Sequence, residues 1–172
     1  MIAVTESIVI GFGGNVGTDE VIRERFERAR EAIGVLAVPG SLRSAPLYRS
    51  APIGPAQPAY LNTAVRVGLG GGQPVELLDT LLELEHLLGR NRAGEARWGP
   101  RPIDLDVLVW GARQLRTPEL VVPHPRLADR KFALAPLVHL LGAGFVVAGV
   151  GAAGELLQRV AGQRCEELAA TW

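Results

Sequence analysis

The chain has 172 residues, 48% of them hydrophobic and 21% charged, and its formal net charge at pH 7 is zero. This length and hydrophobic content predict a single domain over residues 1–172 and exclude an intrinsically disordered chain. The balanced charge argues against a protein that coats nucleic acid, because a basic excess supplies most of such binding, and one cysteine, Cys165, excludes an internal disulfide and a cysteine zinc cluster.

The N-terminal region predicts a buried strand followed by an amphipathic helix. It lacks a basic start with a long apolar run, and no apolar stretch approaches the length of a membrane span, so we expect a cytoplasmic protein with no membrane contact. Residues 7–12 form the strand, and the letters GGNVG indicate a tight turn. Thr18 is the expected N-cap of a helix that continues to about Ile33 and ends at Gly34.

The next segments alternate between strands and loops. Residues 41–49 predict a strand that Pro46 places at an edge or a bulge. Three prolines and a glycine make residues 50–58 a stiff, irregular loop. The alternating pattern of residues 60–69 is typical of a strand, and Pro74 begins a helix that ends before Gly89.

Glu85 interrupts the apolar stripe of this second helix. It follows Leu78 by seven residues, and the stripe is expected to contain Leu78, Leu81, Leu82 and Leu88. A carboxylate at such a position is most simply paired with a nearby arginine. It could also support His124 or a phosphate site.

The second half of the chain has two stronger elements and two weaker ones. We expect a strand over residues 103–110, an irregular proline-rich stretch over 117–131, and a helix over 132–141 that contains Pro136. Weaker patterns suggest a strand at 145–148 and a helix at 155–160. Because neighbouring strands are joined by short connections, the order favours an α+β fold with a mainly antiparallel sheet covered by helices.

Residues 89–106 carry the strongest indication of function. Asp104 and Asp106 point to the same face of the predicted strand, roughly 7 Å apart along the chain. On this alternation, Leu108 and Trp110 continue their face and Val109 lies opposite. Paired carboxylates suit Mg²⁺, and guanidinium groups bind phosphate oxygens in bidentate fashion, so the segment predicts a polyphosphate site in which the carboxylates stand beside Trp98, Arg90, Arg92, Arg97 and Arg101.

Each of these motifs also has a simpler interpretation. The aspartates could mark a solvated strand end, the arginines a solvated loop, and His124, held between two prolines, a structural residue. A dinucleotide fingerprint fails because Val16 stands where its third glycine should be, and a Walker A loop is excluded because Lys131 is the only lysine.

Four segments together resemble one known family. The letters GFGGNVG, LYRSAPIGPAQPAYLN, ARWGPRPIDLDVLVWG and VPHPRLADRKFAL occur in the order typical of 6-hydroxymethyl-7,8-dihydropterin pyrophosphokinases, and the resemblance covers residues 8–140. It implies a ferredoxin-like α+β fold and transfer of pyrophosphate from ATP to the pterin hydroxymethyl group in folate biosynthesis, with two Mg²⁺ ions, a monomeric chain and no nucleic-acid partner.

The resemblance also implies residue roles. Asp104 and Asp106 would bind the two Mg²⁺ ions, and Arg90 and Arg101 would offset charge on the transferred group. ATP contacts are implied for Glu85, Arg92, Trp98, Val107, His124 and Arg130. The pterin pocket would be formed by Ser50, Pro52, Ile53, Tyr60, Asn62 and Phe132.

Two other functions stay open on the sequence. A non-catalytic nucleotide or RNA binder would explain the arginines and Trp98 but not the aspartate pair. A degenerate family member acting as a scaffold is disfavoured by the intact arginine and aspartate set. The last thirty residues carry no functional pattern.

Overall fold

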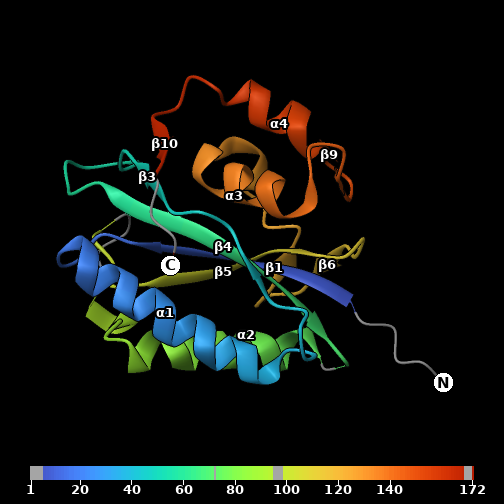
Figure 1. Cartoon of the computed structure of the whole chain (residues 1–172), viewed down its shortest axis with the longest axis horizontal. Helices are drawn as coiled ribbons and strands as arrows, with labels where there is room; N and C mark the ends of the chain where they lie inside the picture. Colours follow the sequence, from blue (N-terminus) through green and yellow to red (C-terminus); the bar gives the residue numbers. More distant parts are fainter. Residues whose placement is uncertain (1–5, 72, 95–98, 169–171) are drawn as a thin grey trace.

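The computed structural model describes residues 6–71, 73–94, 99–168 and 172, and it places one antiparallel sheet between two layers of helices (Figure 1). Trp98 and Arg97 lie outside the described residues. No described helix has both the length and the apolar content needed to cross a membrane.

The helices are α1 (Asp19–Leu36), α2 (Pro74–Leu87), α3 (Lys131–Leu141) and α4 (Ala153–Arg159), with two short 3₁₀ helices, η1 (Arg92–Gly94) and η2 (Leu127–Asp129). The strands of the main sheet are β1 (Glu6–Gly14), β2 (Arg43–Ser44), β3 (Tyr48–Ser50), β4 (Tyr60–Leu69), β5 (Asp104–Trp110) and β10 (Cys165–Glu167). Two separate hairpins pair β6 (Leu115–Arg116) with β7 (Val121–Val122) and β8 (Val146–Val147) with β9 (Gly151–Ala152).

The order of the main sheet confirms the predicted fold. It runs β10–β3–β4–β1–β5, every pairing is antiparallel, and β2 joins β4. Strands β1, β3, β4 and β5 with helices α1 and α2 give the β-α-β-β-α-β order of a ferredoxin-like unit. Figure 1 shows α1 and α2 on one face of the sheet and α3 and α4 on the other.

Each face of the sheet has its own apolar core, and β1 contributes to both. Ile8 and Ile10 pack with α1 and α2, whereas Val9 packs with α3 and α4. On the α3 side the positions that follow Val9 are Gly11 and Gly13, which have no side chains. The sheet is therefore hollowed on that side toward the end of β1, while the other side is filled.

Several details differ from the sequence prediction. Helix α1 continues through Gly34 to Leu36, because Gly34 does not adopt the left-handed backbone with which a glycine ends a helix. The strand expected over 41–49 is divided into β2 and β3. In α2 the buried leucines are Leu77 and Leu81, and Leu78 is only partly buried.

An irregularity in β5 overturns the predicted alternation at its end. The register with β1 shifts between Val9 and Ile10, so Leu108 and Val109 both belong to the α3-side core and Trp110 turns into the α1-side core. A β-bulge adds one residue to a strand and reverses the faces of those beyond it. Asp104 and Asp106 precede the bulge and keep the predicted common face.

The C-terminal segment closes the edge of the sheet. Strand β10 pairs with β3, and the indole of Trp172 packs against the rings of Phe12 and Phe26 while its N–H donates to the carbonyl of Ala45 at 2.8 Å. The pairing of β10 with β3 thus stabilises the strand that contains Ser50.

Candidate functional site

A cavity of about 400 Å³ lies on the α3 side of the sheet, where β1, β4 and β5 approach the loops. It exists because Gly11 and Gly13 leave its floor without side chains. A Cβ at Gly11 would lie 3.1 Å from the side chain of Leu108, and one at Gly13 would lie 3.4 Å from Oδ1 of Asn62. Gly13, which the sequence analysis placed in a turn, is therefore a strand residue, and together with Gly11 it opens the cavity.

Most of the predicted site residues meet in this cavity. Its lining includes Ser50, Ile53, Tyr60, Asn62, Arg90, Arg92, Arg101, Asp104, Asp106, His124, Arg130 and Phe132. They come from β3 and the loop after it, from β4, from the segment between α2 and β5, from β5, and from the region that leads from β7 into the start of α3. Segments separated by eighty residues thus form one site.

Asp104 is held by two arginines at once. Its Oδ2 accepts a hydrogen bond from Arg101 Nη1 at 2.6 Å, and its Oδ1 is paired with the guanidinium of Arg90. Burial opposes ionisation of this carboxyl, but the charges of Arg101 and Arg90 together outweigh it and lower the pKa of Asp104. Asp104 is therefore ionised at neutral pH and holds both guanidinium groups at the cavity wall.

Glu85 lies beneath the cavity and organises the arginines from below. Only 1% of its side chain is exposed, and its Oε1 accepts from Arg90 Nη1 and from the Leu105 amide, both at 2.7 Å. Its Oε2 pairs with Arg92 at 2.5 Å. Burial raises the pKa of Glu85, and the Leu105 amide and the two guanidinium groups oppose that shift. The predicted pairing of Glu85 with an arginine is confirmed.

Asp106 and His124 face each other across the cavity. Burial and the charge of Asp104 raise the pKa of Asp106 to about 7, and Arg130 opposes the rise. Burial and the charge of Arg130 lower the pKa of His124 to about 4, so its ring is neutral at pH 7. The 3.9 Å between His124 Nε2 and Asp106 Oδ2 is therefore not an ion pair at neutral pH.

The tautomer of His124 follows from its second nitrogen. The Arg126 amide donates to His124 Nδ1 at 3.1 Å, which leaves the proton on Nε2, the atom nearer Asp106. His124 can thus donate one hydrogen bond into the cavity.

The other end of the cavity has aromatic walls and a buried amide. Asn62 Nδ2 donates to the Ser50 hydroxyl at 2.9 Å, and both side chains are almost fully buried. The Tyr60 hydroxyl donates to the carbonyl of Gly99 at 3.2 Å, and the guanidinium of Arg130 lies 5.5 Å from the ring centre of Phe132. A flat heteroaromatic ligand with a polar edge fits such a lining.

The two aspartates suit a metal ion that is shared with a ligand. Among the described residues, no cluster of three or more His, Cys, Asp or Glu side chains could hold a metal. Mg²⁺, however, is usually bound by one or two carboxylates together with substrate phosphates and water, not by an all-protein cage. Asp104 and Asp106 in a cavity with arginines meet that requirement.

Three of the predicted residues that the structure describes do not line the cavity. Trp98 lies outside the described residues, Glu85 is buried below the lining, and Pro52 is half-buried in the loop. The side chain of Val107 packs in the core on the opposite face of β5 and does not line the cavity, so its implied contact with ATP stays a prediction. The alternation that placed the aspartates together also turns Val107 away.

Several lining residues were not predicted as site residues, among them Arg126, Thr63 and Leu108. Leu108 was assigned to the correct face but to the core. Arg126 looks like a solvated arginine in a proline-rich stretch, and only its position between His124 and Arg130 could have indicated the site. With it, the described lining carries five arginines against two aspartates, which favours a polyanionic ligand.

Comparisons with known proteins agree with this geometry. Residues 9–142 match the model of the family described as 7,8-dihydro-6-hydroxymethylpterin-pyrophosphokinase (HPPK). The 2-amino-4-hydroxy-6-hydroxymethyldihydropteridine pyrophosphokinase of Synechocystis sp. is 40% identical over 134 residues, which cover 77% of this chain and 65% of that protein. A folate synthesis bifunctional protein of Arabidopsis thaliana is 39% identical over 140 residues, covering 80% of this chain.

The relatives differ from this chain in length. The match spans 27% of the Arabidopsis protein. Among solved structures, a wild-type Plasmodium falciparum HPPK-DHPS with pteroate superposes with a TM-score of 0.66 over 90% of this chain and 42% of that chain, at 12% identity. This last likeness supports the fold alone.

Proposed function

Because the chain belongs to the 7,8-dihydro-6-hydroxymethylpterin-pyrophosphokinase family, we propose that it transfers pyrophosphate from ATP to the hydroxymethyl group of 6-hydroxymethyl-7,8-dihydropterin, giving AMP and the pterin diphosphate in folate biosynthesis. The observation that carries the proposal is one cavity with an arginine–aspartate end and an aromatic–amide end. A polyphosphate suits the first end and a pterin ring suits the second.

At the phosphate end, the residues of this chain position and neutralise charge. Arg90, Arg101 and Arg130 surround the place where the triphosphate would lie, and neutral His124 can donate a hydrogen bond to an oxygen there. Two Mg²⁺ ions bound by Asp104 and Asp106 with the ATP phosphates would supply further charge neutralisation. The substrate hydroxyl would attack the β-phosphorus in line, with AMP leaving.

At the pterin end, the residues orient the ring. Tyr60 and Phe132 would stack on its faces, and Asn62, held by Ser50, would bind its polar edge. The hydroxymethyl group would then point toward the arginines. No side chain is required as a base in this proposal, because positioning and charge stabilisation supply most of the rate in such transfers.

The test of the proposed function is a product assay with ATP, Mg²⁺ and 6-hydroxymethyl-7,8-dihydropterin that separates AMP from ADP. AMP formed with a pterin diphosphate is the expected result. ADP would mean transfer of the γ-phosphoryl group and a different reaction. Absence of turnover with salt-sensitive, Mg²⁺-independent binding of single-stranded RNA would favour the non-catalytic binder instead.

Replacing Arg101 by alanine is expected to lower kcat by about a hundredfold or more and to change the KM for ATP less. Its guanidinium lies beside Asp104, at the place where charge would develop on the transferred group. Steady-state kinetics with both substrates varied would measure this split. The matched control is Arg28→Ala on the exposed side of α1, and a loss confined to ATP affinity would contradict a role in the transition state.

Replacing Tyr60 by alanine is expected to weaken pterin binding about tenfold or more, because a stacking face of the ring is lost. Tyr60→Phe keeps the ring and removes only the hydroxyl, which contacts Gly99 and Gln57, so it should lose less. Calorimetric titration of each variant with pterin and, separately, with a non-hydrolysable ATP analogue would test this. Equal losses for both ligands would argue against stacking.

A further inference from the structure

Asn15 connects three segments that the proposed reaction must hold together. It follows β1 directly, and only 3% of its surface is exposed. Its side-chain Oδ1 accepts a hydrogen bond from the Arg101 backbone N–H at 2.8 Å, and its backbone N–H donates to the Arg101 carbonyl at 2.9 Å. Both backbone groups of Arg101 are thus bound to one residue.

The nitrogen of the Asn15 side-chain amide binds the loop after β3. Nδ2 of Asn15 donates to the Pro58 carbonyl at 3.0 Å and to Gln57 Oε1 at 3.1 Å. The same Gln57 oxygen lies 3.3 Å from the Tyr60 hydroxyl, whose one proton it shares with the Gly99 carbonyl. The orientation of the amide is fixed at both ends, because the Arg101 amide can only donate and the Pro58 carbonyl can only accept.

The end of β1 packs closely against the segment that follows Arg101. A Cβ at Gly14 would lie 2.7 Å from the carbonyl oxygen of Pro102, so the strand and the segment after Arg101 are in close backbone contact. Only a residue with an acceptor and a donor on one short planar group can bond both neighbours from this position. Aspartate offers the acceptor alone, and alanine offers neither.

We infer that Asn15 is a positioning residue that sets the Arg101 backbone and the 51–59 loop relative to each other, its acceptor side governing catalytic turnover and its donor side governing binding of the pterin. This inference rests on the proposed function. Asn15 touches neither the reacting atoms nor the ring, and it acts through Arg101 and through the loop that leads into Tyr60.

The two sides can be separated by two substitutions. Asn15→Asp keeps the acceptor for the Arg101 amide and loses the donor to Pro58 and Gln57, so the KM for the pterin should rise about tenfold while kcat stays within about threefold. Asn15→Ala loses both, so kcat should also fall about ten- to a hundredfold. Gln57→Ala removes a loop partner without touching Arg101 and should resemble Asn15→Asp, with a smaller effect.

Hydrogen exchange followed by mass spectrometry gives a readout that does not depend on turnover. Peptides covering residues 51–60 should exchange faster in both Asn15 variants, and peptides covering 100–105 should do so only in Asn15→Ala. Equal kcat losses in both variants with an unchanged pterin KM, or unchanged exchange over 51–60, would overturn the inference. If the wild-type chain makes no AMP, the proposed function fails, and exchange alone then decides whether Asn15 holds the two segments.

Discussion

Asp106→Asn is expected to lower AMP formation about a thousandfold or more and, at the same time, to raise the melting temperature of the metal-free protein. The loss of activity follows because the amide removes a negative oxygen from the place where Asp104 and Asp106 would bind Mg²⁺. The gain in stability follows because burial and the charge of Asp104 disfavour ionised Asp106 in the folded chain.

The size of this stability effect depends on pH. The pKa of Asp106 is about 7 in the folded protein, above the value of about 3.9 for an unfolded aspartate. The raised pKa therefore lowers the free energy of unfolding. This loss is absent below pH 4, grows between pH 4 and 7, and is constant above pH 7. Because 40% of the side chain is exposed, solvent screening reduces the size of the cost but not its direction.

The experiment compares melting temperatures in a metal chelator at pH 5.5 and pH 8 and product formation with Mg²⁺ at pH 8. The difference between Asp106→Asn and wild type should be larger at pH 8. Asp79→Asn, on the exposed side of α2, is the matched control and should leave both readouts within error. Near-normal turnover of Asp106→Asn at moderate Mg²⁺ would refute the metal assignment, and a lower melting temperature would mean that Asp106 has a structural role.

The sequence predicted the elements whose pattern is local. The alternation in residues 60–69 and 103–107 marked β4 and β5 and placed Asp104 and Asp106 on one face, and helical spacing identified Glu85 as a buried carboxylate. These predictions succeeded because strand and helix periods act over a few residues. The resemblance to a family assigned most of the residues that line the cavity.

The failures come from interactions between distant segments. The bulge that turns Trp110 is set by the pairing of β5 with β1, a hundred residues earlier in the chain. Gly34 fails to end α1, and the glycines of β1 open a cavity whose other walls come from residues 50 to 133. Asn15 gave no indication of its role, because its partners Pro58 and Arg101 are 43 and 86 residues away.

Glu85→Ala is expected to destabilise the protein by about 3–5 kcal/mol, the usual cost of removing one partner of a buried ion pair. Arg90 is 4% exposed and is shared between Glu85 and Asp104, so the loss of Glu85 removes one of the carboxylates that pair with this buried guanidinium. The Leu105 amide loses its acceptor in the same step. Arg92 is half-exposed and can turn to solvent, so it adds little to the cost.

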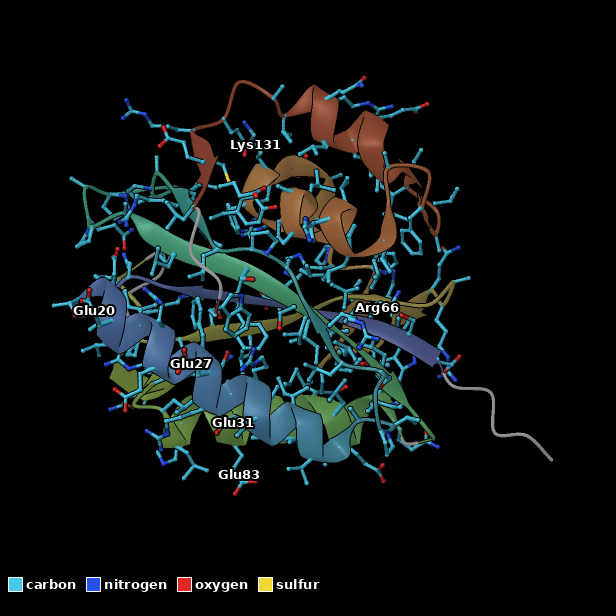
Figure 2. The ribbon with its side chains drawn as sticks, viewed as in Figure 1. Glu20, Glu27, Glu31, Arg66, Glu83 and Lys131 are labelled. Carbon is cyan, nitrogen blue, oxygen red and sulfur yellow. The ribbon has the colours of Figure 1, made fainter. Side chains whose placement is uncertain are left out.

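Equilibrium unfolding in urea would measure this change against Glu83→Ala, a matched control two residues away on the same helix. Figure 2 shows Glu83 pointing away from the sheet, and its removal should change the free energy of unfolding by no more than about 0.5 kcal/mol. Glu85→Gln keeps an acceptor for the Leu105 amide and should fall between the two. If Glu85→Ala matched the control, Arg90 would not depend on Glu85, and Glu85 would not be the residue that orders the arginines beneath the site.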